Sequence, residues 1–332
     1  MVKKWIYWLM TALMLLTLAG CGAGETTEAT ATPVVEAEPL DMARLEQTAT
    51  WLMDTIPEAN FGTIGGEWLI LGLARSGLEI PESYFTVYGE NLAAYTAQQD
   101  GVLHNRKYTE YSRVILAWTA MGRDATDVGG FDLTQPLADF NQTVFQGING
   151  PIFALLALDS GNYTIPEYTG EGVQATKEGY LTYILTAQTS DGGWALSGDT
   201  ADVDLTAMAL QALAKYQDRP DVTEAVEKAL ELLSKKQDTT GGFPVADGET
   251  SESLAQVIVA LTELGIPLTD ARFVKDGHTV LDRLLEFQME SGGFRHIPEG
   301  EEDLMATEQS FYALVAVARA ERGDSTLYTM TP

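Results

Sequence analysis

The chain has 332 residues and carries 48 acidic against 20 basic side chains, which gives a net charge of −28. So strong a negative charge argues against binding to nucleic acid and against lying flat on anionic lipid head groups. Cys21 is the one cysteine in the sequence, so disulfides within a single chain are excluded.

Residues 1–20 have the pattern of a targeting segment. Two lysines form a positive start, and the apolar stretch from Trp5 to Leu18 is too short to remain as a membrane-spanning helix. The sequence Leu-Ala-Gly-Cys that ends at Cys21 resembles a bacterial lipobox. This resemblance implies that a signal peptide is removed before Cys21 and that the new terminal cysteine is lipidated. We therefore expect an extracytoplasmic protein that is anchored to the bacterial cell membrane through lipid on Cys21.

Residues 21–40 are expected to form a flexible tether. After Cys21 the segment is rich in Thr, Ala, Glu, Gly and Pro and lacks helical periodicity, so it cannot bury enough apolar surface to fold. A flexible chain of this length reaches about 25 Å. The tether would hold the remaining residues, 41–332, away from the membrane as one domain.

From Asp41 onward, apolar residues recur at the spacing of amphipathic helices, with little of the alternation that marks strands. The predicted helices cover residues 42–55, 62–77, 81–98, 108–121, 133–144, 148–159, 172–188, 203–217, 221–237, 251–264, 274–289 and 305–321. Twelve helices in six hairpins can close one ring, so the predicted fold class is all-α and the architecture a single α6/α6 toroid. The second helix of each pair is the more apolar, which predicts an inner ring of second helices and an outer ring of first helices.

A loop motif between paired helices recurs three times in the second half of the chain. It reads Gln-x3-Gly-Gly-aromatic and begins at Gln188, Gln237 and Gln288, about fifty residues apart. The glycines permit the positive φ angles that stop a helix and turn the chain. The aromatic residue can cover the helix end, and the glutamine amide can hydrogen-bond to the loop backbone. We interpret the motif as a structural hairpin and not as a site.

The motif resembles the repeat of the prenyltransferase and squalene-oxidase family, whose members form terpenoid cyclase-like α/α toroids. Residues 202–207 are similar to the D-x-D-D-T-A motif of squalene–hopene-type cyclases, with Leu205 in place of the last aspartate. Residues 203–209 also resemble a V-D-T-x-A-M-A run of the cobalamin carriers transcobalamin and intrinsic factor. Residues 147–160 and 305–315 look like runs of bacterial surface lipoproteins that carry the same repeats.

Polar residues at the starts of the predicted inner helices form the candidate site, because these helix starts meet at one mouth of the barrel. When the helices are aligned on their small residues, Asp204 corresponds to Glu252 and to Met305, with Glu308 three residues further on. Asp204, Glu252 and Glu308 are the candidate catalytic residues if the protein is an enzyme. The candidate ligand-binding residues are Trp68, Glu110, Trp118, Asn149, Trp194, Asp202, Asp204, Glu252 and Gln309. Carboxylates at helix starts also serve as plain caps.

Several enzyme classes are disfavoured by the sequence. Leu205 replaces the aspartate that holds the acid of a hopene-type cyclase, and no Asp-Asp pair is present for diphosphate chemistry. Cys21 is assigned to lipid, and His104, His278 and His296 lack the spacing of metal ligands, so each histidine is expected in a loop or at the surface. No metal site and no cofactor are expected.

We predict that the barrel mouth binds a small molecule, a glycan or a surface protein without converting it. An enzyme, either cyclase-like or carbohydrate-active, is the first alternative, and it requires inward carboxylates of which at least one has a raised pKa. A structural spacer is the second alternative, and it requires a barrel centre plugged by Met208, Phe153, Phe311 and Tyr312.

Overall fold

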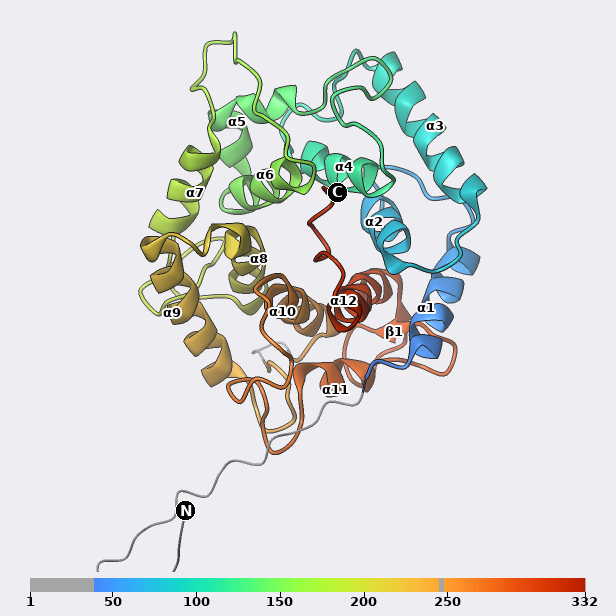
Figure 1. The fold of residues 1–332 in the computed structure, drawn as a ribbon, viewed down its shortest axis with the longest axis vertical. Helices are drawn as coiled ribbons and strands as arrows, with labels where there is room; N and C mark the ends of the chain where they lie inside the picture. Colours follow the sequence, from blue (N-terminus) through green and yellow to red (C-terminus); the bar gives the residue numbers. More distant parts are fainter. Residues whose placement is uncertain (1–38, 245–247, 332) are drawn as a thin grey trace, which may run out of the picture. The chain divides into compact units, whose positions relative to one another are not determined.

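The computed structural model describes residues 39–244 and 248–331, all of which belong to one compact unit, Val35–Pro332. The predicted signal peptide, Cys21 and all but the last two residues of the predicted tether lie outside the described residues. Within them almost all of the regular secondary structure is helical (Figure 1). The one sheet of this part of the chain is an antiparallel pair of two-residue strands, β1 (Phe294–Arg295) and β2 (Glu302–Asp303).

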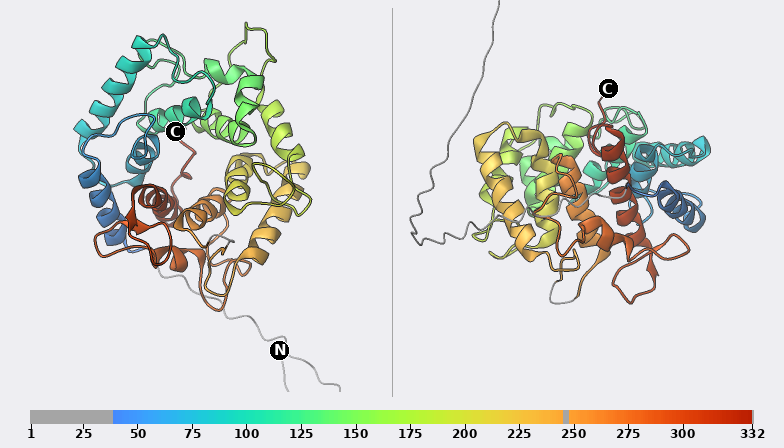
Figure 2. Two further views of the ribbon diagram at one scale, coloured as in Figure 1. Left: turned by 180° about the vertical axis from the view of Figure 1, so that it is seen from behind. Right: turned by 60° about the horizontal axis from the view of Figure 1, so that its bottom comes forward.

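The helices alternate along the chain between an outer and an inner layer (Figure 1). The outer helices are α1 (Met42–Thr55), α3 (Glu82–Gln98), α5 (Phe140–Thr143), α7 (Lys177–Thr186), α9 (Pro220–Lys236) and α11 (Val280–Leu285). The inner helices are α2 (Glu67–Ser76), α4 (Thr109–Ala120), α6 (Asn149–Ser160), α8 (Val203–Leu213), α10 (Ser251–Glu263) and α12 (Leu304–Arg322). Each inner helix packs on the next, and α12 packs on α2, so the inner layer is a closed ring (Figure 2, left). This arrangement is the predicted α6/α6 toroid.

The inner helices are the more apolar ones, as the sequence predicts. Every residue of α10 from Ser251 to Thr262 is buried, whereas α9 buries one stripe of alanine, valine and leucine and exposes glutamate and lysine on its other face. Small residues let neighbouring inner helices approach closely. A Cβ added to Gly72 of α2 would lie 2.8 Å from the Phe311 ring of α12. Phe311 therefore packs between two inner helices.

Two predicted helices are shorter than their apolar periodicity indicates, which corrects the prediction. The segment 133–144 is broken by a 3₁₀ turn that contains Pro136, and α5 starts afresh with Asp139 as its N-cap. The segment 274–289 becomes helical only after Thr279, because an Asp-Gly turn with positive φ angles precedes that residue and Thr279 then caps α11. Of the other helices, α2 and α7 each begin five residues later than predicted, and the rest lie within a few residues of their predicted bounds.

The glutamines of the loop motif tie α7, α9 and α11 each to the next outer helix or to the segment that leads into it. Gln188 Nε2 donates to a carbonyl of its own loop at 2.8 Å and to the Ala225 carbonyl of α9 at 2.9 Å. Gln237 Nε2 likewise donates to its own loop and to the Phe273 carbonyl ahead of α11, both at 3.0 Å. The interpretation of this amide as a partner for loop backbone groups is confirmed, and the amide also joins successive repeats.

The third copy of the motif closes the ring. Gln288 Nε2 donates to the Arg44 carbonyl at 3.1 Å and to the Thr48 hydroxyl at 2.9 Å, and both partners lie on α1. Arg44 Nη1 returns a hydrogen bond to Gln288 Oε1 at 2.7 Å. The last outer helix is therefore joined to the first in the same way as its predecessors are joined to one another.

The glycines and aromatic residues of the motif are fixed by close packing. Gly241 has a φ of +85°, and a Cβ there would lie 2.6 Å from the Thr279 carbonyl oxygen, so a side chain is excluded. Trp194, Phe243 and Phe294 are at most 1% exposed. The indole N–H of Trp194 donates to a carbonyl near the end of α7 at 2.7 Å. Each aromatic residue thus fills its own hairpin.

The C-terminal tail, residues 324–331, returns over the C-terminal ends of the inner helices and reaches the middle of the ring (Figure 1). Leu327 and Tyr328 are 0% and 3% exposed. The tail and the β1–β2 hairpin lie on opposite faces of the ring (Figure 2, right). The tail therefore closes one end of the barrel, away from the helix starts.

Polar contacts hold the tail in place. Arg75 Nη2 donates to the carbonyls of Thr326 at 2.7 Å and Thr329 at 2.8 Å. The backbone N–H of Tyr328 donates to the Glu263 carboxylate at 3.0 Å. These side chains lie at the ends of α2 and α10, so the tail also supplies partners for helix termini.

Candidate functional site

The starts of three inner helices are fixed by side-chain caps. The N-caps of α8, α10 and α12 are Asp202, Thr250 and Asp303, and each side chain accepts a hydrogen bond from a backbone N–H in the first turn. Asp204, Glu252 and Met305 are consequently each the second residue of their helix, as the sequence alignment predicts. Asp202 is exposed and caps α8.

Asp204 is a mostly buried carboxyl group with an unused oxygen. Burial raises the pKa of Asp204 from 3.8 to about 6, and the negative charges of Asp202 and Glu252 add to this, while a hydrogen bond from Ser253 opposes it. Its Oδ1 is buried and has no hydrogen-bond partner among the described residues. A group that combines desolvation with an open acceptor is a candidate for contact with a ligand.

Glu252 lies beside Asp204 and is paired with a histidine. It is 6% exposed, and both carboxylate oxygens lie 2.9 Å from the Nδ1 atom of His296, whose side chain is 53% exposed. His296 lies in the loop between β1 and β2, so the expectation of a loop position is confirmed. The sequence did not indicate its pairing with Glu252, because the two residues are far apart in the chain.

Glu308 caps the N-terminal end of the neighbouring helix α2. Its Oε1 accepts the backbone N–H groups of Gly65 at 3.1 Å and Leu69 at 3.0 Å. Burial raises the pKa of Glu308 to about 7; the two backbone hydrogen bonds lower it, and the nearby charge of Glu67 raises it. Glu67 is itself 1% exposed, and its Oε2 has no partner among the described residues. Glu67 therefore has a buried oxygen that could accept a hydrogen bond from a ligand.

The remaining inner helices, α4 and α6, bring further polar groups to this end. Glu110 forms an ion pair with Arg113 one turn along α4. The Nε of Arg113 and the Oδ1 of Asn149 are both buried without a hydrogen-bond partner in the described part of the chain. The predicted residues Glu110 and Asn149 therefore lie at the same end of the inner ring as Asp204.

A cavity of about 70 Å³ lies inside the inner ring, about one helical turn beyond the acidic residues. It is lined by aromatic, amide and thioether side chains, which are those of Trp68, Phe153, Met208, Gln256, Gln309, Tyr312 and Tyr328. The ring of Trp68 lies 5.6 Å from that of Phe153 and 5.8 Å from that of Tyr312, measured between centroids. Met208 and Gln256 follow Asp204 and Glu252 by four residues, so each lies on the same helix face as the acid before it.

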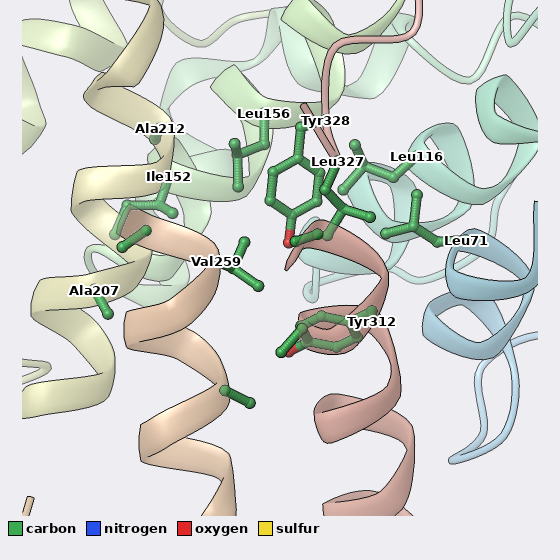
Figure 3. Packing of buried hydrophobic residues seen from close by; sticks show 14 of the residues in the cluster. Leu71, Leu116, Ile152, Leu156, Ala207, Ala212, Val259, Tyr312, Leu327 and Tyr328 are labelled. Atoms are coloured by element: carbon green, nitrogen blue, oxygen red, sulfur yellow. The ribbon is translucent and has the colours of Figure 1, made fainter. Parts of the chain in front are cut away.

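The tail forms the floor of this cavity. Tyr328 enters the barrel between Leu116 and Leu156, and its hydroxyl is directed towards Tyr312 (Figure 3). Gln256 donates to the Tyr312 hydroxyl and, at 2.9 Å, to Gln309 Oε1. Aromatic rings and an amide pair thus surround a space that is closed from the tail side. The predicted site residues Trp68 and Gln309 line this cavity.

Of the two other predicted tryptophans, Trp118 lies at the opposite end of the ring, whereas Trp194 lies at this end, where its backbone carbonyl accepts the Asp202 N–H at 2.9 Å. Trp118 is near the C-terminal end of α4, is 6% exposed and donates its indole N–H to the Asp124 carbonyl at 3.0 Å. Trp194 is the aromatic residue of a loop motif and is 0% exposed. Both side chains are used for packing, so neither can contact a ligand without rearrangement.

Exposed apolar side chains occur in the segments that lead into the inner helices. Ile64, Phe145, Leu196 and Met305 have exposed fractions of 51%, 55%, 60% and 43%. They precede α2, α6 and α8 or lie in the first turn of α12. The acidic end of the ring therefore has an apolar margin, which is a common property of binding surfaces.

The described residues contain no helix with the length and apolarity that a membrane crossing requires. They also contain no cluster of three or more His, Cys, Asp or Glu side chains placed to hold a metal ion.

The alternation of outer and inner helices, closed by the contact of α12 with α2, defines the class of fold as an α/α toroid. No protein-family model matches the sequence, and a search of curated proteins gave no match. Solved structures do match in fold. The chain is similar to the type II terpene cyclase MstE from Scytonema, with a TM-score of 0.53 and 15% identity over 84% of this chain and 98% of the cyclase chain.

Two further structures have the same arrangement. Unsaturated glucuronyl hydrolase from Bacillus sp. GL1 gives a TM-score of 0.54 at 12% identity, over 87% of this chain and 98% of that chain. A protein from Actinoplanes gives 0.51 at 13% identity, over 84% and 99%. At such identities the likeness is one of fold. It shows that the chain has an α/α toroid fold, and function has to be argued from the site.

Proposed function

We propose that the toroid binds a small molecule at the acidic end of its inner ring and does not convert it. The observation that carries this proposal is the blind cavity beyond Asp204, lined by aromatic and amide side chains and closed by Tyr328. Small-molecule sites are concave, mostly apolar and provided with a few polar groups that orient the ligand. The space of about 70 Å³ suits one end of a ligand, and the rest would lie against the apolar margin.

The open acceptors define the chemistry of that ligand end. Asp204 Oδ1 and Asn149 Oδ1 are buried and have no partner among the described residues, so each gains a hydrogen bond from a donor that enters the ring. Aromatic faces and carboxylates together also favour a positive charge. The ligand therefore carries a donor-rich or cationic group, such as an amine or a hydroxylated end.

A spacer function is less well supported. Phe153, Met208 and Tyr312 surround the cavity, as a plug would require, but they leave it unfilled. Phe311 packs against Gly72 between two helices and does not enter the cavity. A spacer also gains nothing from buried acceptors without partners, which cost stability.

The test is a thermal-shift screen of the full chain in detergent against amines, corrinoids, isoprenoids and oligosaccharides. A ligand at a hundredfold excess over its Kd stabilises the native state by about 2.7 kcal/mol, which gives a visible shift. Asp204→Asn should reduce the shift, and Asp218→Asn, which makes the same chemical change at an exposed position, should leave it unchanged. No shift with any class, or an equal shift in the Asp204 variant, would contradict the proposal.

An acid-dependent enzyme is the second candidate, and the raised pKa values favour it. Asp204, at about 6, and Glu308, at about 7, are partly protonated near neutral pH and can act as general acids. Any ligand found by the screen should therefore be incubated with the protein and followed by mass spectrometry. A product that disappears with Asp204→Asn while the ligand still binds would establish turnover. An unchanged ligand would favour the binding function.

We also propose that the protein is held outside the cytoplasm by lipid on Cys21. The support is the lipobox-like sequence that ends at that residue and the polar tether that follows it. Metabolic labelling with a clickable fatty acid should mark the wild-type protein in the membrane fraction. Cys21→Ala should lose the label, and an unlabelled wild-type protein would exclude the anchor.

A further inference from the structure

A second cavity, of about 670 Å³, lies outside the inner ring on the far side of the α4 start. Four segments form its walls: the turn after α3, the first turn of α4, the region around the 3₁₀ helix η1 (Gln135–Ala138), and the loop between α6 and α7. Tyr108, Tyr111, Phe131 and Tyr168 are its aromatic residues. This cavity shares no lining residue with the inner cavity, so a ligand here is independent of the function proposed above.

The walls of this cavity are held rigidly by their own hydrogen bonds. The Tyr168 hydroxyl donates to Asp139 Oδ2 at 2.7 Å, and Asp139 Oδ1 accepts a backbone N–H at the start of α5 at 3.1 Å. The Tyr111 hydroxyl accepts the Leu103 N–H at 3.1 Å. The rings of Tyr108 and Tyr111 meet edge to face, with centroids 5.3 Å apart. Such walls lose little conformational entropy when a ligand binds.

The polar groups of the cavity that remain available to a ligand include both hydrogen-bond donors and acceptors. In the described part of the chain, the Tyr108 hydroxyl, the Asp100 carboxylate and the Asn105 amide take part in no side-chain hydrogen bond. His104 Nδ1 accepts two backbone N–H groups at 3.0 Å, so the neutral ring carries its proton on Nε2 and offers a donor. Of the two carboxylate oxygens of Asp132, only Oδ1 accepts side-chain or backbone hydrogen bonds from the described residues.

We propose that this cavity binds a neutral saccharide. A sugar has an apolar C–H face that packs on an aromatic ring and a rim of hydroxyls that both donate and accept, which matches tyrosine rings combined with amide, carboxylate and imidazole groups. A simple ammonium group can only donate hydrogen bonds. It would therefore leave the N–H donors of Asn105 and His104 without acceptors. An anionic sugar would face the carboxylates of Asp100, Asp132 and Asp139.

Titration calorimetry of the full chain in detergent tests this assignment. The probes are cellohexaose, maltohexaose, mannohexaose, xylohexaose and chitohexaose, with hexagalacturonate as the anionic comparison. At least one neutral hexasaccharide should bind, and hexagalacturonate should bind more weakly or not at all. The assignment is overturned if none of the neutral sugars binds, or if hexagalacturonate binds as tightly as the best of them.

Variants locate the binding. Tyr108→Ala should weaken it roughly tenfold or more, and Tyr108→Phe, which removes only the hydroxyl, by roughly two- to tenfold. Tyr183→Ala is the matched control, because Tyr183 is also partly exposed and lies outside the cavity. Asn105 is exposed, so Asn105→Ala should fold normally and still weaken binding. Unchanged affinity in the Tyr108 and Asn105 variants would overturn the assignment even if a sugar binds.

Discussion

Replacing Asp204 by asparagine should stabilise the protein at neutral pH and have little effect in acid. The carboxyl group is mostly buried, and its pKa is raised from 3.8 to about 6, chiefly by desolvation. Ionisation is therefore harder in the folded chain than in the unfolded chain. Asparagine has nearly the same shape, can still accept the hydrogen bond from Ser253, and does not ionise.

The size and sign of the effect follow from the two pKa values. Each pKa unit is worth about 1.4 kcal/mol, so ionising Asp204 in the folded state costs about 3 kcal/mol more than in the unfolded state. Below pH 3.8 Asp204 is protonated in both the folded and the unfolded chain, so it costs no stability. Between pH 3.8 and about 6 the folded state holds more protons, so stability falls as pH rises. About one unit above the folded-state pKa, near pH 7, the loss is complete and constant.

Urea unfolding of the wild-type protein and of Asp204→Asn, at intervals from pH 4.5 to pH 8, measures this difference. The variant's advantage should grow from about 1 kcal/mol at pH 4.5 to about 3 kcal/mol above pH 6.5. Asp218→Asn, at an exposed position, controls for the change in net charge. A difference that does not vary with pH, or a variant that is less stable at pH 7, would show that Asp204 is not held in a desolvating environment.

Two further substitutions test the architecture. Tyr328→Ala removes a side chain that is 3% exposed at the barrel centre, and we expect a loss of about 3–5 kcal/mol in urea unfolding, as for other large buried rings; a loss below 1 kcal/mol would mean that the tail does not fill the barrel. Gln237→Ala leaves two buried carbonyls without their donor and should cost about 1–3 kcal/mol. The exposed Gln217→Ala is its control, and equal stability of the two variants would refute the role of Gln237 as a joint.

Most of the fold could be predicted because its determinants are local and repeated. Helical periodicity and the Gln-x3-Gly-Gly-aromatic loops encode the hairpins, and six hairpins have few ways to bury their apolar faces other than a ring. The predictions were wrong where a short turn signal competes with periodicity. Pro136 and the Asp-Gly turn before Thr279 each shorten a helix that its apolar residues favour.

The candidate site could be predicted only in part. Asp204 and Glu252 were located because a cap and a fixed spacing determine which residue is second in its helix. Gln256 also had a signal, since it follows Glu252 by one turn and has the same residue type as Gln309. No signal in the sequence marks Tyr328, because a short aperiodic tail reaches the cavity only through contacts with distant residues.

The hydrogen bonds between Gln288 and α1 affect how the domain unfolds. Open arrays of helical hairpins fray from their ends, because a terminal repeat has one neighbour instead of two. Here Gln288 gives α1 the same lateral bond that Ala225 receives from Gln188, so no repeat is terminal. Opening any hairpin also breaks the packing of its inner helix on two neighbouring inner helices. We therefore expect unfolding in a single step, and the ring can lock only after residue 288 has reached α1.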